Sequence, residues 1–393
     1  MAVSSLESTP VAGFNSLHAA PTTPNGNDSI EKMLHGLMEM LMQLVQTMKK
    51  KGDKESPASQ NPEAGAGSTP STGAPTGSGS GSLESTPSGQ GSNPAPVGIS
   101  GTAAGKSTDL GQGQDPSIVK FDGQYWEARV NGPQTVGLAH SANLSDIENG
   151  SAQQSTIEVH APGFNAESPS LAVVQDPTSG KSELAIYVTD KQKSEDGSHN
   201  GTGMIDVVTI GNDKDPSGSA VDHGYIKGLN GYDPQEFSDP NNGKNYMLTS
   251  GNGTINIQQM KNPWTTEGAP TALASAQQSY ETKDGNIVEA PAAVFSDKKL
   301  NIIYSSNNWQ DSSYNLNGMS TDANADPLDA SGYKKNGTIL DSANSGLSGP
   351  GSGAFFQDAN GQTQFEFNAN NDQGKREIYV QKAGFDANGN LKP

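Results

Sequence analysis

The fold is decided most clearly by residues 232–260, which read Tyr-Asp-Pro-Gln-Glu-Phe-Ser-Asp-Pro-Asn-Asn-Gly-Lys-Asn-Tyr-Met-Leu-Thr-Ser-Gly-Asn-Gly-Thr-Ile-Asn-Ile-Gln-Gln-Met. Three short runs, 236–238, 246–250 and 254–259, are separated by Asp-Pro-Asn-Asn-Gly and by Asn-Gly. Asp or Asn before Gly supplies the positive backbone dihedrals that tight hairpins need. The stretch therefore predicts three strands joined by hairpins.

The same pattern of short apolar runs separated by Gly-containing turns recurs on both sides of this stretch, with hairpin turns at 121–123, 176–180 and 358–361. The other candidate strands are 117–121, 125–129, 170–175, 184–189, 204–210, 292–295, 300–305, 314–320, 353–357, 364–368 and 377–383. Repeated hairpins of this kind predict an all-β domain over 108–393, built from four-stranded blades in radial repetition, which is a β-propeller.

Composition restricts the core and the class of partner. Only 31% of the 393 residues are hydrophobic and 47 are Gly, so not all of the chain can pack. The net charge of −19 argues against a nucleic-acid partner, because binding to phosphates needs a basic face, whereas an acidic surface suits neutral ligands such as sugars. The absence of Cys excludes disulfides, thiol catalysis and Cys-based zinc sites.

The N-terminal region contains one helical pattern between two polar segments. Residues 1–26 lack the basic start and apolar core of a cleaved secretory signal and are predicted to be disordered. Over 27–51, apolar residues at spacings of three and four predict an amphipathic helix, and 52–107 is a Gly-, Ser- and Pro-rich disordered linker. Docking on the C-terminal domain, self-association and contact with a membrane or partner are alternatives for this helix.

Three carboxylates stand in similar settings along the predicted repeat. They are Asp115 in Asp-Pro-Ser-Ile, Asp233 in Tyr-Asp-Pro-Gln and Glu289 in Glu-Ala-Pro-Ala. Each precedes a polar turn and a short apolar strand, so one structural unit presents an acid from several sheets. An acid near Pro is also a common turn former, which is the alternative interpretation for each residue taken alone.

In this order the motifs resemble glycoside hydrolase family 43, five-bladed propellers that act on arabinose- and xylose-containing plant polysaccharides. The matching segments are Gln-Asp-Pro-Ser-Ile-Val at 114–119, Tyr-Asp-Pro at 232–234, Val-Glu-Ala-Pro at 288–291, Asn-Ile-Ile-Tyr-Ser at 301–305 and Gly-Pro-Gly at 349–351. The resemblance extends over about 108–393.

The resemblance implies an inverting hydrolase of arabinan or xylan side chains: an arabinanase, arabinofuranosidase or xylosidase. Inversion uses one carboxylate to activate water and one protonated carboxyl to protonate the leaving group, held roughly 6.5 to 9.5 Å apart. By this resemblance Asp115 is the general base and Glu289 the general acid. Asp233 orients the acid and raises its pKa by like-charge repulsion. No cofactor is implied.

The chain also departs from the family pattern. Ser352 stands where the family usually carries His after Gly-Pro-Gly, Asn368 where a second His often occurs, and 167–170 read Glu-Ser-Pro-Ser instead of Trp-Ala-Pro-Asp. The missing His weakens a central site for metal or water, so the sequence leaves open whether Ca²⁺ occupies the channel. Ser352 is assigned to substrate binding. Trp126 and Trp309 are candidates for stacking on sugars, with packing between blades as the alternative.

A helix on a Gly-, Ser- and Pro-rich, cysteine-free arm before a polysaccharide-acting domain also resembles the two-part harpins of plant-pathogenic bacteria. This resemblance implies type III-like export without a cleaved signal peptide, to the plant apoplast or wall, and a role in virulence. Cell-wall polysaccharide is the expected partner. A second function therefore stands beside the enzyme: a non-catalytic harpin-like elicitor whose propeller only binds the wall and whose helix 27–51 is the active element.

Overall fold

The computed structural model describes residues 108–112, 115, 117–132, 134–159, 165–193, 199–371 and 374–392. The predictions for 1–26, 27–51 and 52–107 lie outside these residues. No helix within the described ranges has the length and apolar character needed to cross a membrane.

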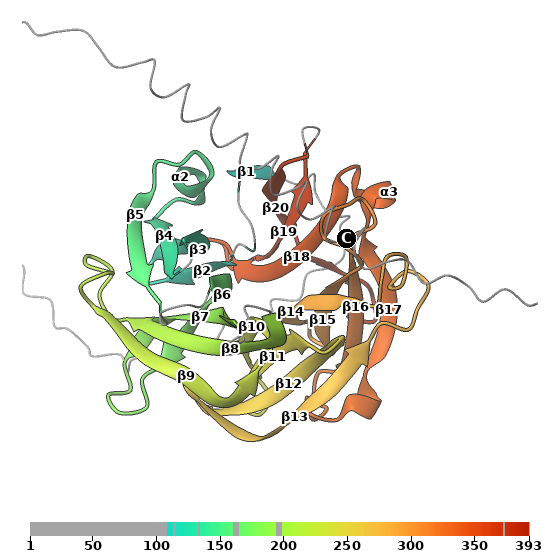
Figure 1. The fold of residues 1–393 in the computed structure, drawn as a ribbon, viewed down its shortest axis with the longest axis horizontal. Coiled ribbons are helices and arrows are strands. Elements are labelled where there is room, and N and C mark those ends of the chain that lie inside the picture. The colour runs from blue at the N-terminus through green and yellow to red at the C-terminus, as the bar shows by residue number, and fades with distance from the viewer. Residues whose placement is uncertain are drawn as a thin grey trace, which may run out of the picture. The chain divides into compact units, whose positions relative to one another are not determined.

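Five four-stranded antiparallel sheets make up the described domain (Figure 1). Blade 1 consists of β2 (Ser117–Phe121), β3 (Gln124–Gly132), β4 (Thr135–Ser141) and β5 (Gln153–Glu158). Blade 2 consists of β6 (Asn165–Gln175), β7 (Ser182–Lys193), β8 (His199–Ile210) and β9 (Ala220–Asn230). Blade 3 consists of β10 (Tyr232–Ser238), β11 (Asn245–Gly251), β12 (Thr254–Asn262) and β13 (Thr265–Ser275).

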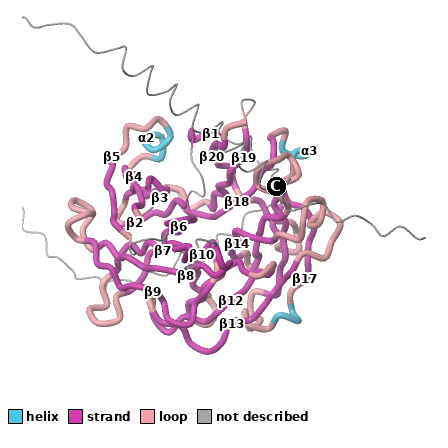
Figure 2. The backbone as a smooth tube through the Cα atoms, in the orientation of Figure 1, coloured by secondary structure: helices cyan, strands magenta, loops and turns pink. Residues whose placement is uncertain are grey.

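The last two blades and the short elements complete the domain. Blade 4 consists of β14 (Val288–Phe295), β15 (Lys299–Ser306), β16 (Asn315–Asp322) and β17 (Lys334–Leu340). Blade 5 consists of β18 (Ser348–Gln357), β19 (Thr363–Asn370), β20 (Arg376–Lys382) and β1 (Thr108–Gln112). The short elements are α2 (Leu144–Glu148), the 3₁₀ helix η1 (Ala330–Gly332), α3 (Ser342–Ser345), β21 (Gly384–Phe385) and β22 (Leu391–Lys392). Strands dominate the described backbone, and α2 and α3 lie at its periphery (Figure 2).

The first strands of the five blades form a closed inner ring. β2 contacts β6, β6 contacts β10, β10 contacts β14, β14 contacts β18, and β18 returns to β2. The outer strand of blade 5 is β1, which precedes blade 1 in the sequence and pairs antiparallel with β20. The ring is therefore closed by joining the two ends of the domain in one sheet. The prediction of an all-β, five-bladed propeller is confirmed.

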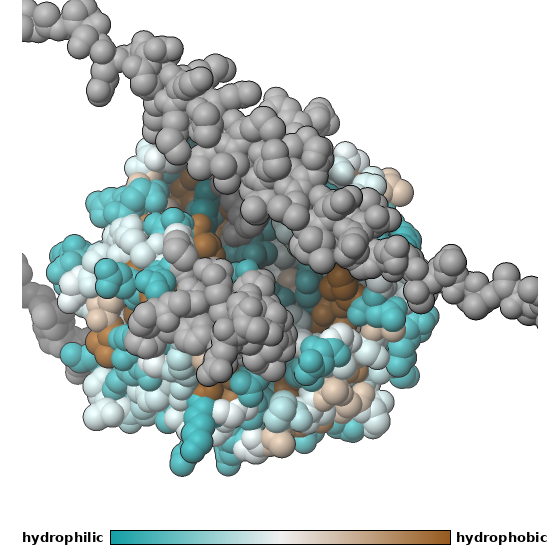
Figure 3. Space-filling model, viewed as in Figure 1, coloured by the Kyte–Doolittle hydropathy of each residue, from teal (hydrophilic) through white to brown (hydrophobic). Residues whose placement is uncertain are grey.

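The hydrophobic core lies between the blades. Alternation along β7 sends Leu184, Ile186 and Val188 into a cluster shared with blade 1, whereas Ala185 and Tyr187 join a cluster shared with blade 3. Each of the five junctions between neighbouring blades has such a cluster. Each blade is thus held on both faces by its neighbours. The visible outer surface is largely hydrophilic, with hydrophobic residues in scattered places (Figure 3).

Candidate active site

One residue from each blade lines a pocket on the axis of the inner ring. These five residues are Asp115, Ser168, Asp233, Ala290 and Ser352, with φ values of 48°, 48°, 54°, 50° and 50°. Positive φ is uncommon for residues other than Gly. In blades 2 to 5 the pairing of the first with the second strand shifts register around this position. Such bulges redirect side chains, which explains why five equivalent positions meet at one pocket.

The structure brings the three predicted carboxylates together here. Asp115 lies just before β2 and Asp233 is the second residue of β10, and both line the pocket. Glu289, the second residue of β14, precedes the pocket residue Ala290, whose backbone N–H donates to Asp233 Oδ2 at 2.9 Å. The charges of both aspartates raise the pKa of Glu289. The trio is therefore one electrostatic unit.

Asp115 is held by polar groups of blade 5. Ser352 Oγ donates to Asp115 Oδ1 at 2.8 Å, and the Asp115 backbone N–H donates to Asn368 Oδ1 at 2.9 Å. Burial, followed by the charge of Asp233, raises the pKa of Asp115 to about 6, against the opposing hydrogen bond from Ser352 and the charge of Arg376. Ser352, predicted to bind substrate, thus contacts a carboxylate in this structure.

Glu289 is more readily protonated than Asp115. Burial, followed by the charge of Asp233, raises its pKa to about 7, although Tyr314 Oη donates to Glu289 Oε1 at 2.7 Å and lowers the pKa. Tyr314 packs closely against Gly351, where a Cβ atom would lie 1.8 Å from its ring. The second Gly of the Gly-Pro-Gly motif is therefore needed for the tyrosine that contacts Glu289.

Asp233 is fixed by three donors. Ser168 Oγ donates to Asp233 Oδ1 at 2.6 Å, while Ser250 Oγ and the Ala290 N–H donate to Oδ2 at 2.6 and 2.9 Å. A carboxylate with three donors has a defined orientation. Its negative charge then acts on Asp115 and Glu289 from a fixed position.

Arg376, at the start of β20, is a cation of the site that the sequence analysis missed. Its Nη1 donates to the Gly349 carbonyl at 3.0 Å and to the Trp309 carbonyl at 3.4 Å, and its guanidinium lies 5.3 Å from the Tyr314 ring centroid. Its charge lowers the pKa values of Asp115 and Glu289. No motif marks this arginine in the sequence, because it reaches the acids only through the closed ring.

The two tryptophans have different environments. The prediction that Trp126 stacks on sugar is wrong: the side chain is fully buried in the core between blades 1 and 2. It stacks on His140 with ring centroids 4.2 Å apart, and its Nε1 donates to the Phe121 carbonyl at 3.2 Å. Packing, the alternative interpretation, applies. Trp309 is 44% exposed beside Arg376, so its role in sugar stacking stays a prediction.

The described residues contain no group of three or more His, Cys, Asp or Glu side chains that could hold a metal ion. The Ca²⁺ left open by the sequence thus has no such ligand cluster in this part of the chain, and Ser352 at the channel mouth is hydrogen-bonded to Asp115.

Comparison with known proteins identifies the family. The model of glycosyl hydrolases family 43 matches residues 110–391. The chain belongs to this family. An extracellular exo-α-(1→5)-L-arabinofuranosidase from Streptomyces avermitilis is 32% identical to this chain over 114 residues, which are 28% of this chain and 24% of that protein. The match thus spans about a quarter of this curated relative.

Solved structures share the fold of the family 43 domain. An α-L-arabinofuranosidase from Lactobacillus brevis superposes with a TM-score of 0.62 at 21% identity, over 72% of this chain and 95% of that one. A thermostable family-43 glycoside hydrolase superposes with a TM-score of 0.56 at 17% identity, over 74% of this chain and 95% of that one. An endo-1,4-β-xylanase from Bacteroides thetaiotaomicron superposes with a TM-score of 0.55 at 18% identity, over 73% of this chain and 95% of that one.

Proposed function

We propose that this family 43 protein hydrolyses arabinan or xylan side chains of plant cell walls with inversion at the anomeric carbon. The observation that carries the proposal is the grouping of two carboxyl groups with raised pKa values, Asp115 and Glu289, around a fixed Asp233. Pairs of carboxyl groups tuned in this way are the requirement of acid and base catalysis near neutral pH.

Asp115 and Glu289 have complementary tasks in this mechanism. Asp115, ionised, accepts a proton from a water molecule as the water oxygen attacks the anomeric carbon. Glu289, protonated, gives its proton to the glycosidic oxygen as the bond to the leaving group breaks. One proton is thus taken up and one is released, and both carboxyl groups return to their starting states by exchange with solvent.

Asp233 and Tyr314 tune the acid in opposite directions. The charge of Asp233 raises the pKa of Glu289 and so maintains its protonated form, whereas the Tyr314 hydroxyl stabilises the carboxylate that remains after proton transfer. Both groups are fixed by contacts within the protein, so little reorganisation accompanies the reaction.

Arabinose-containing substrates are the first class to test. The curated relative from Streptomyces avermitilis is an exo-arabinofuranosidase, and one similar structure is an arabinofuranosidase. The charged groups around the pocket are the three acids, Glu167 and Arg376, and a neutral sugar adds no charge that would disturb the pKa values of Asp115 and Glu289. Debranched arabinan therefore comes before arabinoxylan in the assay.

The rate of sugar release is expected to depend on pH as a narrow bell with its maximum between about 6 and 7. Below this window Asp115 becomes protonated and cannot accept the proton of water, and above it Glu289 loses the proton that it must donate. The measurement is reducing-sugar release by the full chain from debranched arabinan, arabinoxylan and the matching nitrophenyl glycosides between pH 4 and 9. Absence of release from every substrate, by a folded protein, contradicts the proposal.

Type III-like export, self-association or membrane contact of helix 27–51, and the harpin-like elicitor function stay predictions, because 1–107 lie outside the described residues. The elicitor function is tested by deleting 27–51. The elicitor interpretation requires that this deletion abolishes the response of plant tissue and that Glu289→Gln does not.

A further inference from the structure

A chain of hydrogen bonds runs through the five equivalent positions at the channel mouth. Ser352 Oγ donates to Asp115 Oδ1 at 2.8 Å. Ser168 Oγ lies 3.5 Å from Asp115 Oδ2 and 2.6 Å from Asp233 Oδ1. The Ala290 N–H then donates to Asp233 Oδ2 at 2.9 Å. Around the ring, donor and acceptor alternate from blade 5 through blades 1, 2 and 3 to blade 4.

The hydroxyl groups of the two serines donate to different carboxylates. A hydroxyl has a single proton to donate, and the distances give that of Ser168 mainly to Asp233. Ser352 is therefore the committed side-chain donor to Asp115. Its own backbone N–H donates to Ser305 Oγ at 2.8 Å, so blade 4 fixes its position. Both serines stand where the family pattern usually has other residues, His for Ser352 and Ala for Ser168.

We propose that Ser352 and Ser168 are positioning residues of this site: Ser352 holds Asp115 in its ionised, attacking orientation, and Ser168 keeps Asp233 at a fixed distance from it. The inference rests on the proposed function. It assigns to Ser352 a task toward the base, in place of the substrate contact expected from sequence. Because a hydroxyl does not titrate near neutral pH, unlike an imidazole, the side-chain donor to Asp115 does not change its own charge over the working range.

The other charges around Asp115 are unaffected by exchange of a serine. They come from Glu167 on β6, Asp233 on β10, Glu289 on β14 and Arg376 on β20. The charges of Asp233 and Glu167 raise the pKa of Asp115 and so oppose its ionisation, whereas the charge of Arg376 lowers this pKa and favours ionisation. A change in the titration of Asp115 on loss of the Ser352 hydroxyl therefore reports the hydrogen bond.

The test compares full-length Ser352→Ala and Ser352→Gly with the wild type. Removal of the donor is expected to move the acid limb of the pH profile of kcat/KM upward by about one pH unit, with KM nearly unchanged. Both variants lack the hydroxyl, but only Gly relieves the positive φ of 50°. Equal shifts in the two variants support the hydroxyl as the cause, and a shift in Ser352→Ala alone assigns it to the backbone and overturns the proposal.

Ser168→Ala and Ser238→Ala extend the comparison. Ser168→Ala is expected to lower kcat about tenfold with a smaller shift of the acid limb, because its nearer acceptor is Asp233. Ser238, at the other end of β10, donates to Asn245 Oδ1 at 2.8 Å and provides the same chemical change away from the pocket. An acid limb that does not move in either Ser352 variant, or that moves equally in Ser238→Ala, overturns the proposal.

A second readout does not depend on activity. The titration midpoint of the Asp115 carboxyl is followed by ¹³C NMR in full-length protein with labelled Asp, and the signal is assigned with Asp115→Asn. A midpoint that rises in Ser352→Ala supports the positioning role, and an unchanged midpoint overturns it. If the wild type releases no sugar, the proposed function fails, while this titration still decides the role of Ser352.

Discussion

Replacing Glu289 with Gln is expected to lower kcat on arabinan by about 10²- to 10⁴-fold, the usual contribution of a general acid. Gln has nearly the shape of Glu and its carbonyl can still accept from Tyr314 Oη, but it has no proton to give to the glycosidic oxygen. The substitution also removes no apolar contact from the core, so thermal unfolding should be little changed. The measurement is kcat by reducing-sugar release, with thermal unfolding in parallel.

The leaving group distinguishes loss of the acid from general damage. A nitrophenyl leaving group departs without much protonation, so Glu289→Gln should lose far less activity on a nitrophenyl glycoside than on arabinan. The matched control is Glu236→Gln on β10. Burial raises the pKa of Glu236 to about 8, so this residue is already neutral at the working pH and its replacement changes no charge there. Equal losses on both substrates would contradict the assignment of Glu289 as the acid.

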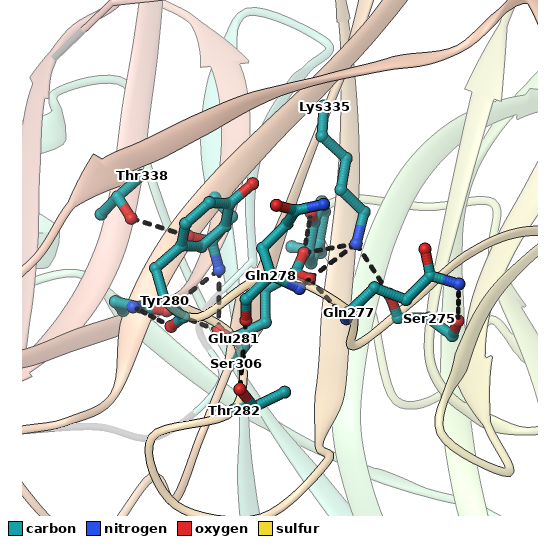
Figure 4. Close-up of polar contacts among 12 residues, drawn as sticks. Ser275, Gln277, Gln278, Tyr280, Glu281, Thr282, Ser306, Lys335 and Thr338 are labelled. Atoms are coloured by element: carbon teal, nitrogen blue, oxygen red, sulfur yellow. Dashed lines mark hydrogen bonds and ion pairs between the residues drawn. The ribbon is translucent and has the colours of Figure 1, made fainter.

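Replacing Lys335 with Met is expected to lower the free energy of unfolding by about 3 to 5 kcal/mol, the cost of leaving a buried charge without its partner. Lys335 Nζ lies 2.6 and 2.7 Å from the two carboxylate oxygens of Glu281, which is fully buried (Figure 4). Glu281 also accepts from Tyr304 Oη at 2.5 Å and from the N–H groups of Gln277 and Gln278, both at 2.8 Å. This network holds the loop that leads into β14 and Glu289.

The loss should depend on pH with a defined sign. Burial raises the pKa of Glu281, but the hydrogen bonds from Lys335, Tyr304 and the backbone outweigh it, so the pKa in the folded protein is lowered. The pair therefore stabilises the fold above the unfolded pKa of Glu281 and ceases to do so as the pH falls through the lowered value. The difference between Lys335→Met and wild type, measured by urea unfolding, should be largest at neutral pH and decrease in acid.

Two variants serve as controls for the buried pair. Adding Glu281→Gln to Lys335→Met removes the orphaned charge and should recover part of the lost stability. Lys299→Met removes a pair with the exposed Asp322 and should cost only about 0 to 1 kcal/mol. A cost for Lys335→Met as small as that for Lys299→Met would contradict the importance of the network.

The inner strands of the blades could be predicted from the sequence, and the outermost strands could not. Every candidate strand from 117–121 to 377–383 lies within or overlaps a strand of the structure. The missed strands include β5, β9, β13 and β17, in which exposed and half-buried residues outnumber buried ones. An outer strand packs on one side at most and is polar, so it lacks the apolar alternation by which strands are recognised. β1 was missed because its pairing with β20 joins segments from opposite ends of the domain.

The candidate site shows the same division between local and distant information. Asp115, Asp233 and Glu289 were found because each stands in a short motif before an inner strand. Arg376 has no motif, and Ser168 stands in a segment that departs from the family motif. Both act through contacts with distant parts of the chain, which only the closed ring creates. Trp126 was misassigned because composition cannot distinguish an aromatic ring packed between two blades from one at a sugar site.

The most direct test of the central claim is the configuration of the sugar at the moment of its release. The full chain is mixed with debranched arabinan or a nitrophenyl arabinofuranoside in an NMR tube, and the anomeric proton signals are recorded before mutarotation. The account predicts that the first anomer to appear is opposite in configuration to the glycosidic bond, because Asp115 activates water and forms no bond to the sugar. Initial release with retained configuration would require a covalent intermediate and would contradict the assignment of Asp115 as the base.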